Sequence, residues 1–281
     1  MSDIIEIQHL TKSYGKHRGV EDVSFHVREG EIFGFLGPNG AGKSTTIRSM
    51  LGLIRYQSGR IRLFGKDAVK CRSELLRQIG YMPSEAMFYP AMRVRDVICF
   101  AASIHGTDCR NEAEKLCERL QVNTERRINE LSLGNRKKVS IVCAMQHRPK
   151  LFIFDEPTSG LDPLMQTEFF HLIQEYVKLG ATCLLSTHIL PEVRNYCQRV
   201  AIMKEGRLMC VDEVAHLTHT TAKRIRMVRD GKQEDFLYEK DLNELYKELK
   251  DHNIEDILIE EPPLEDIFMR FYVGMTSENR K

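Results

Sequence analysis

The sequence predicts an α/β fold in which helices alternate with the strands of a parallel sheet. The stretch "EIFGFLG" (31–37) is apolar with little alternation, as a strand covered on both faces would be. A glycine-rich turn and a helix-like stretch follow it directly. Between residues 150 and 212 strand and helix patterns then take turns. This order implies parallel strands joined by right-handed crossovers.

Length and composition are those of a globular protein. The 281 residues can hold one large domain and a small one, and 42% are apolar and 29% charged. A net charge of +1 gives no support for a nucleic-acid partner. No apolar run approaches the roughly 20 residues that cross a bilayer, and the N-terminus lacks a secretory pattern. Eight scattered cysteines without a CxxC pair favour a reduced, cytoplasmic chain.

The first strands are expected to be antiparallel. The stretches "IIEIQHL" (4–10) and "VEDVSFHV" (20–27) alternate apolar and polar residues, as half-buried antiparallel strands do. After the glycine-rich turn, "KSTTIRSMLGLI" (43–54) indicates a helix and "GRIRLFG" (59–65) a strand. The stretch "LLRQIGYMP" (75–83) indicates the end of a helix that leads into a strand.

Strand signals are absent from about 84 to 144, where apolar residues recur at helical spacing. We therefore predict a helical subdomain at 84–144. Strand signals return afterwards, with helical stretches at 164–180 and 189–197 between the first pairs. The predicted strands are "KLFIFDEP" (150–157), "TCLLSTH" (182–188), "RVAIMKEG" (199–206) and "RLMCVD" (207–212).

The chain becomes more charged after about Leu217. A strand at "KRIRMVRD" (223–230), an amphipathic helix at 240–252, a strand at "IEDILIEE" (254–261) and a short helix after Pro262-Pro263 are expected there. We accordingly predict a main domain at 1–217 and a small α+β accessory domain at 218–281.

The glycine-rich turn fits a phosphate-binding loop. Gly37, Gly42, Lys43 and Ser44 match G-x-x-x-x-G-K-[ST] after a strand and at the opening of a helix. Glycines let backbone N–H groups turn toward phosphate oxygens, and the helix adds its positive end. Lys43 is expected to reach the β- and γ-phosphates, and Ser44 to offer its hydroxyl to Mg²⁺. The predicted ATP-binding loop is Gly37, Pro38, Asn39, Gly40, Ala41, Gly42, Lys43, Ser44 and Thr45.

A second acidic motif narrows the chemistry. The apolar run in "LFIFDEP" delivers Asp155 and Glu156 to the end of a buried strand of the same sheet. Asp155 can hold the water shell of Mg²⁺, and Glu156 can polarise an attacking water. A base at this place fits hydrolysis rather than transfer to a second substrate, which disfavours a kinase.

Taken together, the motifs resemble those of the ATP-binding subunit of an ABC transporter. The stretch "LSLGNRKKV" (131–139) resembles the signature of that family, "SGLD" (159–162) its D-loop and "STH" (186–188) its switch histidine. Tyr14 in "LTKSYG" stands where the family keeps an aromatic residue that stacks on adenine. The resemblance covers roughly residues 3–215. It implies a P-loop NTPase fold with a RecA-like core, an antiparallel β subdomain and an inserted helical subdomain.

The resemblance also implies a mechanism. Two such subunits, as a homodimer or a heterodimer, hold each ATP between the phosphate loop of one chain and the signature of the other. Signature residues Ser132, Gly134 and Asn135 would contact the partner's nucleotide, and Asp162 would act across the interface. His188 would bond the γ-phosphate from its own chain. Closure on ATP and reopening after hydrolysis would drive a transmembrane permease, with this chain held at the inner face of the membrane.

Two motifs depart from the family pattern. Leu133 and Asn135 stand where the signature usually has a glycine and a glutamine, so we expect closure to be retained but weaker. Ser84, followed by Glu85, stands where the family has the glutamine that senses the γ-phosphate site. Ser84 is therefore a further candidate beside the metal.

Single cassettes of this size with a C-terminal extension resemble the ATPases of small drug, bacteriocin and lantibiotic-immunity exporters. "GYMPSE" and "PPLEDIFMRFY" (262–272) carry this second resemblance. An importer ATPase is the alternative. A soluble ABC ATPase that acts on ribosomes or DNA is a further one, disfavoured because the chain has one cassette, no heptad insertion and no basic surplus.

Overall fold

A computed structural model of the chain describes residues 2–15, 17–85, 87–218, 223–238, 242–250 and 254–260. The chain divides into two compact units, Met1–Val211 and Asp212–Lys281. The division falls a few residues ahead of the boundary at 217 that the sequence predicts. The short helix predicted after Pro262-Pro263 lies outside the described residues.

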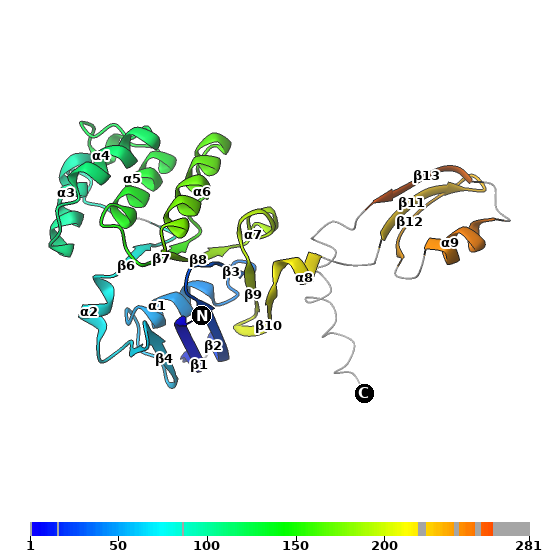
Figure 1. Cartoon of the computed structure of the whole chain (residues 1–281), viewed down its shortest axis with the longest axis horizontal. Coiled ribbons are helices and arrows are strands. Elements are labelled where there is room, and N and C mark those ends of the chain that lie inside the picture. Colours follow the sequence, from blue (N-terminus) through cyan, green and yellow to red (C-terminus); the bar gives the residue numbers. More distant parts are fainter. Residues whose placement is uncertain are drawn as a thin grey trace. The chain divides into compact units, whose positions relative to one another are not determined.

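A six-stranded sheet forms the centre of the first unit, in the order β10-β9-β3-β8-β7-β6 (Figure 1). The pairs that lead from β6 to β9 are parallel, which confirms the predicted α/β core. Every residue of β3 and β7 is buried, which explains why these two strands show no alternation in the sequence. The strands are β3 (Ile32–Leu36), β6 (Ile79–Met82), β7 (Leu151–Asp155), β8 (Thr182–Thr187), β9 (Arg199–Lys204) and β10 (Arg207–Glu213).

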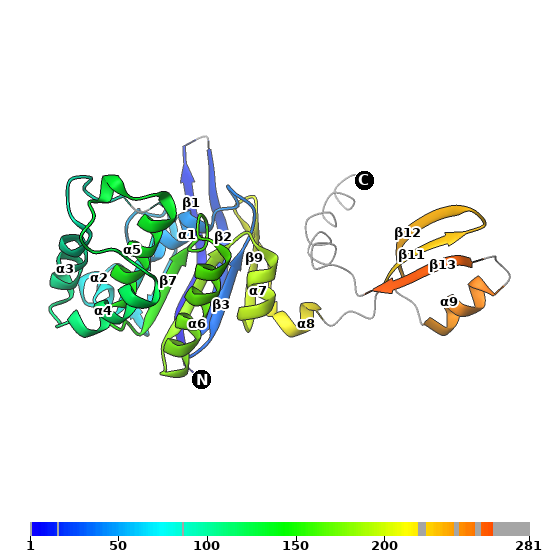
Figure 2. The ribbon, with the colours of Figure 1, turned by 90° about the horizontal axis from the view of Figure 1, so that it is seen from above.

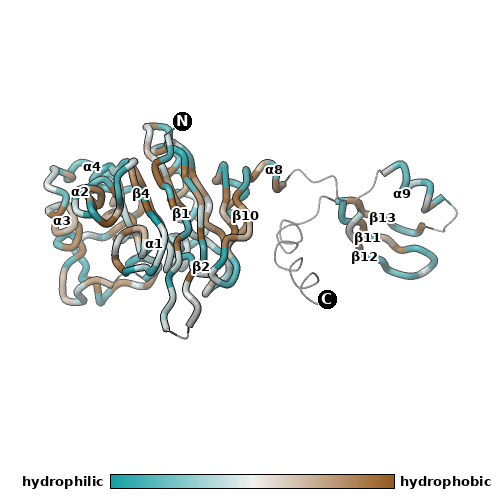
Figure 3. Tube along the Cα trace, turned by 90° about the horizontal axis from the view of Figure 1, so that it is seen from below, coloured by the Kyte–Doolittle hydropathy of each residue, from teal (hydrophilic) through white to brown (hydrophobic). Residues whose placement is uncertain are grey.

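A second, antiparallel sheet has the order β2-β1-β4-β5. Hydrophobic and hydrophilic segments alternate along its strands (Figure 3), as expected for a sheet with one face on the core. Helix α1 contacts both β7 and β2 and so lies between the two sheets. The elements are β1 (Asp3–Tyr14), β2 (His17–Arg28), β4 (Ser58–Leu63), β5 (Lys66–Asp67) and α1 (Lys43–Met50).

Helices cover the other face of the central sheet (Figure 2). Helices α3 and α4 pack on α5, and α5 packs on β6, so the helical stretches predicted within 84–144 form a layer at this end of the sheet. None of the described helices is both long and apolar enough to span a membrane. The helices are α2 (Arg72–Leu76), α3 (Val94–His105), α4 (Arg110–Arg119), η1 (Ile128–Glu130), α5 (Leu133–Met145), α6 (Pro163–Lys178) and α7 (Leu190–Tyr196).

The second unit holds a small antiparallel sheet of order β12-β11-β13. Ile225, Met227, Tyr238 and Leu245 form its core. The strands predicted at 223–230 and 254–261 correspond to β11 and β13, and the helix predicted at 240–252 corresponds to α9. The strand β12 was not predicted. The elements are β11 (Lys223–Arg229), β12 (Lys232–Tyr238), β13 (Ile254–Glu260), α8 (Val214–Thr218) and α9 (Leu242–Leu249).

Two histidines stack where the helical layer meets β6. The rings of His105 and His147 lie 3.5 Å apart, centroid to centroid, with an angle of 10° between their planes. His147 also contacts the carbonyl oxygen of Ile79 on β6. Burial, together with the neighbouring His105, lowers the pKa of His147 to about 4. The His147 ring therefore stays neutral in the folded chain near pH 6.

We predict that this pair makes the fold sensitive to acid. Below its usual pKa of 6.5 the imidazole of His147 takes up a proton in the unfolded chain, but in the folded chain only near pH 4. Folding stability is therefore lost as the pH falls from 6.5 toward 4, and between pH 7 and pH 5 the loss should be about 1–2 kcal/mol. Urea unfolding at these two pH values should show a smaller loss for His147→Gln. Equal losses in the variant and the unaltered chain would contradict the prediction.

Candidate active site

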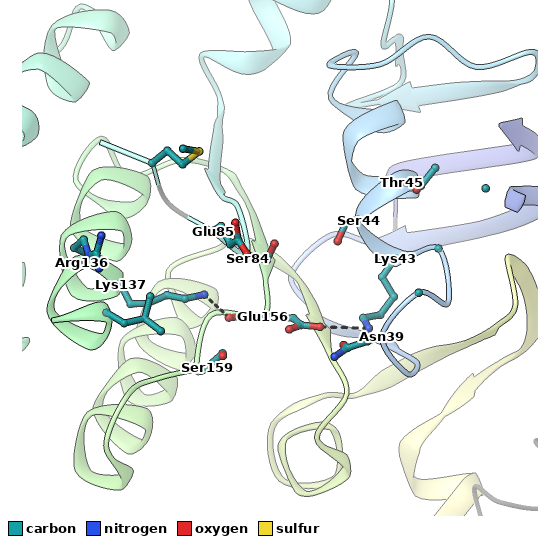
Figure 4. Close-up of a pocket in the computed structure, with 15 residues that line it drawn as sticks. Asn39, Lys43, Ser44, Thr45, Ser84, Glu85, Arg136, Lys137, Glu156 and Ser159 are labelled. Carbon is teal, nitrogen blue, oxygen red and sulfur yellow. Dashed lines mark hydrogen bonds and ion pairs between the residues drawn. The ribbon is translucent and has the colours of Figure 1, made fainter. Parts of the chain in front are cut away.

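A cleft of about 700 Å³ lies between the glycine-rich loop, the segment after β6 and the start of α5 (Figure 4). It contains many of the predicted site residues, which come from three separate parts of the chain. Those that line it are Asn39, Gly40, Gly42, Lys43, Ser44, Thr45, Ser84 and Glu156. The other lining residues are Gly19, Glu85 and Met87, with Leu133, Arg136 and Lys137 from the signature stretch and Ser159 from the D-loop.

The loop needs glycine at two of its positions for steric reasons. Gly42 has a φ of +103°, and a Cβ there would lie 2.6 Å from Cγ1 of Val20. A Cβ on Gly37 would lie 2.5 Å from the carbonyl oxygen of Met203. Gly42 is also the N-cap of α1 and supplies no side-chain cap, so the first N–H groups of the helix stay available. Such a helix start is suited to bind an anion.

Lys43 is held inside the loop that it follows. Its Nζ donates to the carbonyl oxygens of Gly37 at 2.6 Å and of Pro38 at 3.2 Å. The side chain is only 4% exposed, and its ammonium lies 3.5 Å from Oε1 of Glu156. Burial lowers the pKa of Lys43, while Glu156 and Asp155 oppose this shift. The site thus keeps a cation at the floor of the cleft beside the anion-binding helix start.

Glu156 is the point where three chain segments meet. Its Oε1 lies 3.5 Å from Nζ of Lys43 and 3.4 Å from Nδ1 of His188. Its backbone has a φ of +52°, in the left-handed region that side chains rarely adopt. The three residues predicted to be catalytic therefore lie together, and the strained backbone turns the carboxylate of Glu156 toward the other two.

Asp155 has an unusual environment for a carboxylate. It is 1% exposed. Neither of its carboxylate oxygens, nor Oγ of the adjacent Ser186, has a hydrogen-bond partner among the described residues. A buried charge without partners is costly unless another group compensates it. Carboxylate and hydroxyl oxygens are ligands that Mg²⁺ prefers, so the buried Asp155 and the hydroxyl of Ser44, which lines the cleft, fit such an ion.

The signature and the D-loop lie beside each other, and the four residues predicted to act on the partner's ATP are not among the described residues that line this chain's own cleft. Ser132 caps α5 by accepting from the N–H of Asn135 at 3.3 Å, and Asp162 caps α6 in the same way. A Cβ on Gly134 would lie 2.5 Å from the carbonyl oxygen of Gly160, so the two loops pack backbone to backbone. Among the described residues, none of Ser132, Gly134, Asn135 and Asp162 lines the cleft.

Leu133, which departs from the family pattern, lies over the D-loop. A Cβ on Gly160 would meet Cδ2 of Leu133 at 3.3 Å. The Leu133 side chain is nevertheless 58% exposed and forms part of the cleft wall. Its apolar surface is therefore available to a molecule that approaches the signature from outside.

Tyr14 lies next to the cleft rather than in it. The ammonium of Lys12 lies 4.8 Å from the centre of its ring, and the residue is 44% exposed. A Cβ on Gly19 would lie 3.4 Å from Cδ2 of Tyr14, and Gly19 lines the cleft. The Tyr14 ring thus lies beside Gly19, at the edge of the cleft.

A buried carboxylate that the sequence analysis missed connects two of the functional loops. Glu192 on α7 accepts hydrogen bonds from the hydroxyls of Thr158 and Thr187, both at 2.5 Å. Burial raises the pKa of Glu192, and the two hydroxyls act in the opposite direction. Thr158 directly precedes the D-loop and Thr187 directly precedes His188. Glu192 therefore links the D-loop to the segment that carries His188. Nothing in the local pattern "ILPEVRN" marks this contact, because Thr158 is distant in sequence.

Known proteins are similar to this chain in sequence and in fold. The ABC transporter family matches residues 20–159. The bacitracin transport ATP-binding protein BcrA of Bacillus licheniformis is 40% identical over 212 residues, which are 74% of this chain and 69% of that protein. The Nod factor export ATP-binding protein I of Paraburkholderia xenovorans is 35% identical over 208 residues, 72% of this chain and 68% of that protein. A solved structure of the ATP-binding subunit of an ABC transporter superposes with a TM-score of 0.73 at 29% identity, over 88% of this chain and 99% of that one.

Proposed function

The chain belongs to the family of ABC transporter ATP-binding proteins, which are ATPases, and on this premise we propose that it powers export across a membrane. It would hydrolyse Mg²⁺-ATP as one half of a dimer docked on a permease. The ATPase role belongs to residues 1–217, with 218–281 as an accessory domain. The permease would hold the chain at the cytoplasmic face of the membrane.

The observation that carries the proposal is the position of Glu156. Its carboxylate faces the cleft and lies within 3.5 Å of both Lys43 and His188. Lys43 and the N–H groups at the start of α1 would bind the β- and γ-phosphates. Glu156 would accept a proton from the attacking water, and His188 would donate a hydrogen bond to the γ-phosphate.

Mg²⁺ would be held by the Ser44 hydroxyl and, through water, by Asp155, whose buried carboxylate oxygens have no hydrogen-bond partner in the described part of the chain. When bound, the ion neutralises charge on the phosphates. Ser84 also lines the cleft and is a further candidate near the ion. Tyr14, at the rim, would stack on the adenine.

The dimer is proposed because Ser132, Gly134, Asn135 and Asp162 lie outside this chain's own cleft. Ser132 caps α5, so Ser132, Gly134 and Asn135 present a helix start that would contact the partner's ATP. Asp162, the cap of α6, would act across the interface. Leu133, on the surface of the signature, would weaken this contact without preventing it.

Export, rather than import, is proposed on two grounds. The Nod factor protein is named for export and BcrA for bacitracin transport, and they align with 72% and 74% of this chain. The chain also carries the second unit that the exporter resemblance leads one to expect after the cassette.

Co-purification tests the proposed function. The full chain with an affinity tag would be expressed together with the membrane protein encoded beside it and captured from detergent-solubilised membranes. We expect the two to co-purify and the membrane protein to raise ATP turnover. Capture of ribosomes or DNA in place of a membrane protein would contradict the proposal.

A further inference from the structure

Lys137 is a buried cation at the cleft that the proposed mechanism does not use. It lies in the second turn of α5, is 3% exposed and lines the cleft. Its Nζ donates to the main-chain carbonyl oxygen of Glu156 at 2.7 Å (Figure 4). The bond joins α5, the helix that begins at the signature, to the main chain of Glu156, the proposed base.

Glu156 is fixed by its backbone on both sides. Its N–H donates to the carbonyl oxygen of Ser186 at 3.0 Å, and its own carbonyl accepts from Lys137. A non-glycine residue with a φ of +52° stays in that conformation only when the surroundings hold it there. Loss of the bond from Lys137 would free one side of the peptide and allow the carboxylate to turn away from Lys43 and His188.

The ammonium is suited to this task electrostatically. Burial lowers the pKa of Lys137, while Glu156, Asp155 and Glu85 oppose this shift. An apolar side chain of the same length could fill the space but could not donate to the carbonyl. Lys138 offers a matched comparison, because it is also buried on α5 but is not among the described residues that line the cleft.

The other end of the link is the signature itself. Ser132 caps α5 five positions before Lys137, about 7.5 Å along the helix axis. Gly134 packs against the backbone of Gly160, so the start of the helix is also fixed to the D-loop. A displacement of α5 therefore pulls on the carbonyl of Glu156 through a short, rigid path.

We propose that Lys137 is a positioning residue for ATP hydrolysis, which holds the backbone of Glu156 and couples the orientation of this base to the position of α5. The proposal rests on the proposed role of Glu156 as the base. In the dimer, an ATP that engages the signature of one chain would act through Lys137 on that chain's own base. Occupancy of one site would thus set the hydrolysis rate at the other.

The test compares Lys137→Met, Lys137→Gln and Lys137→Arg with Lys138→Met in the full chain. Turnover is expressed per nucleotide-binding site, counted with a fluorescent ATP analogue, so that misfolded protein does not contribute. We expect Lys137→Met and Lys137→Gln to lower kcat about 10-fold or more with KM changed less than about 2-fold, because misplacing a reacting group costs rate rather than binding. Lys137→Arg, which keeps a donor, should recover part of kcat, and Lys138→Met should stay within about 2-fold of the unaltered chain.

Three results would overturn the proposal. The first is a kcat of both Lys137→Met and Lys137→Gln close to that of the unaltered chain. The second is a loss of kcat in Lys138→Met as large as in these two variants. The third is an effect of the Lys137 variants on KM alone. The same variant in a Glu156→Gln background gives an independent check, since a residue that acts only through Glu156 should cause no further loss there. Failure of the proposed function is recognised separately, because the unaltered chain would then show no ATP turnover that depends on Lys43.

Discussion

Replacing Lys43 by methionine is expected to weaken ATP binding by about two orders of magnitude or more. Lys43 is the first residue of α1, and its buried ammonium lies 3.5 Å from the carboxylate of Glu156. Without it, the phosphates lose a charge-assisted hydrogen bond worth about 1.5–3 kcal/mol. They also face the Glu156 carboxylate, which then keeps His188 but has lost Lys43 as a partner. A loss of about 3 kcal/mol corresponds to roughly 100-fold in affinity.

Titration with a fluorescent ATP analogue measures this effect. Lys66→Met is a suitable control, because Lys66 lies on the exposed strand β5 and pairs with Glu74 away from the cleft. Thermal unfolding of both variants shows whether the fold is kept. An affinity of Lys43→Met within about 2-fold of the unaltered chain would mean that the loop does not bind the triphosphate.

Glu156→Gln should abolish most hydrolysis while leaving binding intact. Glutamine keeps the size of the side chain and an oxygen toward Lys43, but it cannot accept a proton from water. Removal of a general base typically costs about 10²–10⁴-fold in kcat, so turnover should fall by that amount. The affinity for ATP should change little, because the contacts of Lys43 with Gly37 and Pro38 remain.

The same variant should accumulate as an ATP-bound dimer. Light scattering after size exclusion would show the dimer with ATP and Mg²⁺ but not with ADP, alone or with the permease. Glu114→Gln on α4, an exposed residue away from the cleft, serves as the matched control and should hydrolyse ATP normally. Unchanged turnover in Glu156→Gln would exclude this carboxylate as the base.

Local patterns were enough to predict the parts of the site that a single segment forms. The loop from Gly37 to Ser44 has glycine where a Cβ would strike Val20 or Met203, and such positions leave a signal in the sequence. The buried strand before Asp155 is likewise visible as an uninterrupted apolar run. Both features depend on consecutive residues, so they could be located before the structure was known.

Contacts between distant segments could not be predicted in this way. The bond from Lys137 to Glu156 and the bridge from Glu192 to Thr158 join residues 19 and 34 positions apart. A lysine in "RKK" on a helix is usually exposed, and only the packing of α5 on β6 makes this one a donor to the site. The strand β12 was missed although Asp230-Gly231, with φ of +50° and +75°, is a typical hairpin turn pair. The first four residues of β12 are all polar, so its sequence shows no alternation of polar and apolar residues there.

A crystal structure of the Glu156→Gln chain with ATP and Mg²⁺ tests the central claim most directly. We expect the triphosphate to lie in the loop from Gly37 to Ser44, with Lys43 on its β- and γ-phosphates and Mg²⁺ between the Ser44 hydroxyl and the water shell of Asp155. ATP bound elsewhere with that loop empty, or an ion that Asp155 does not approach, would contradict it.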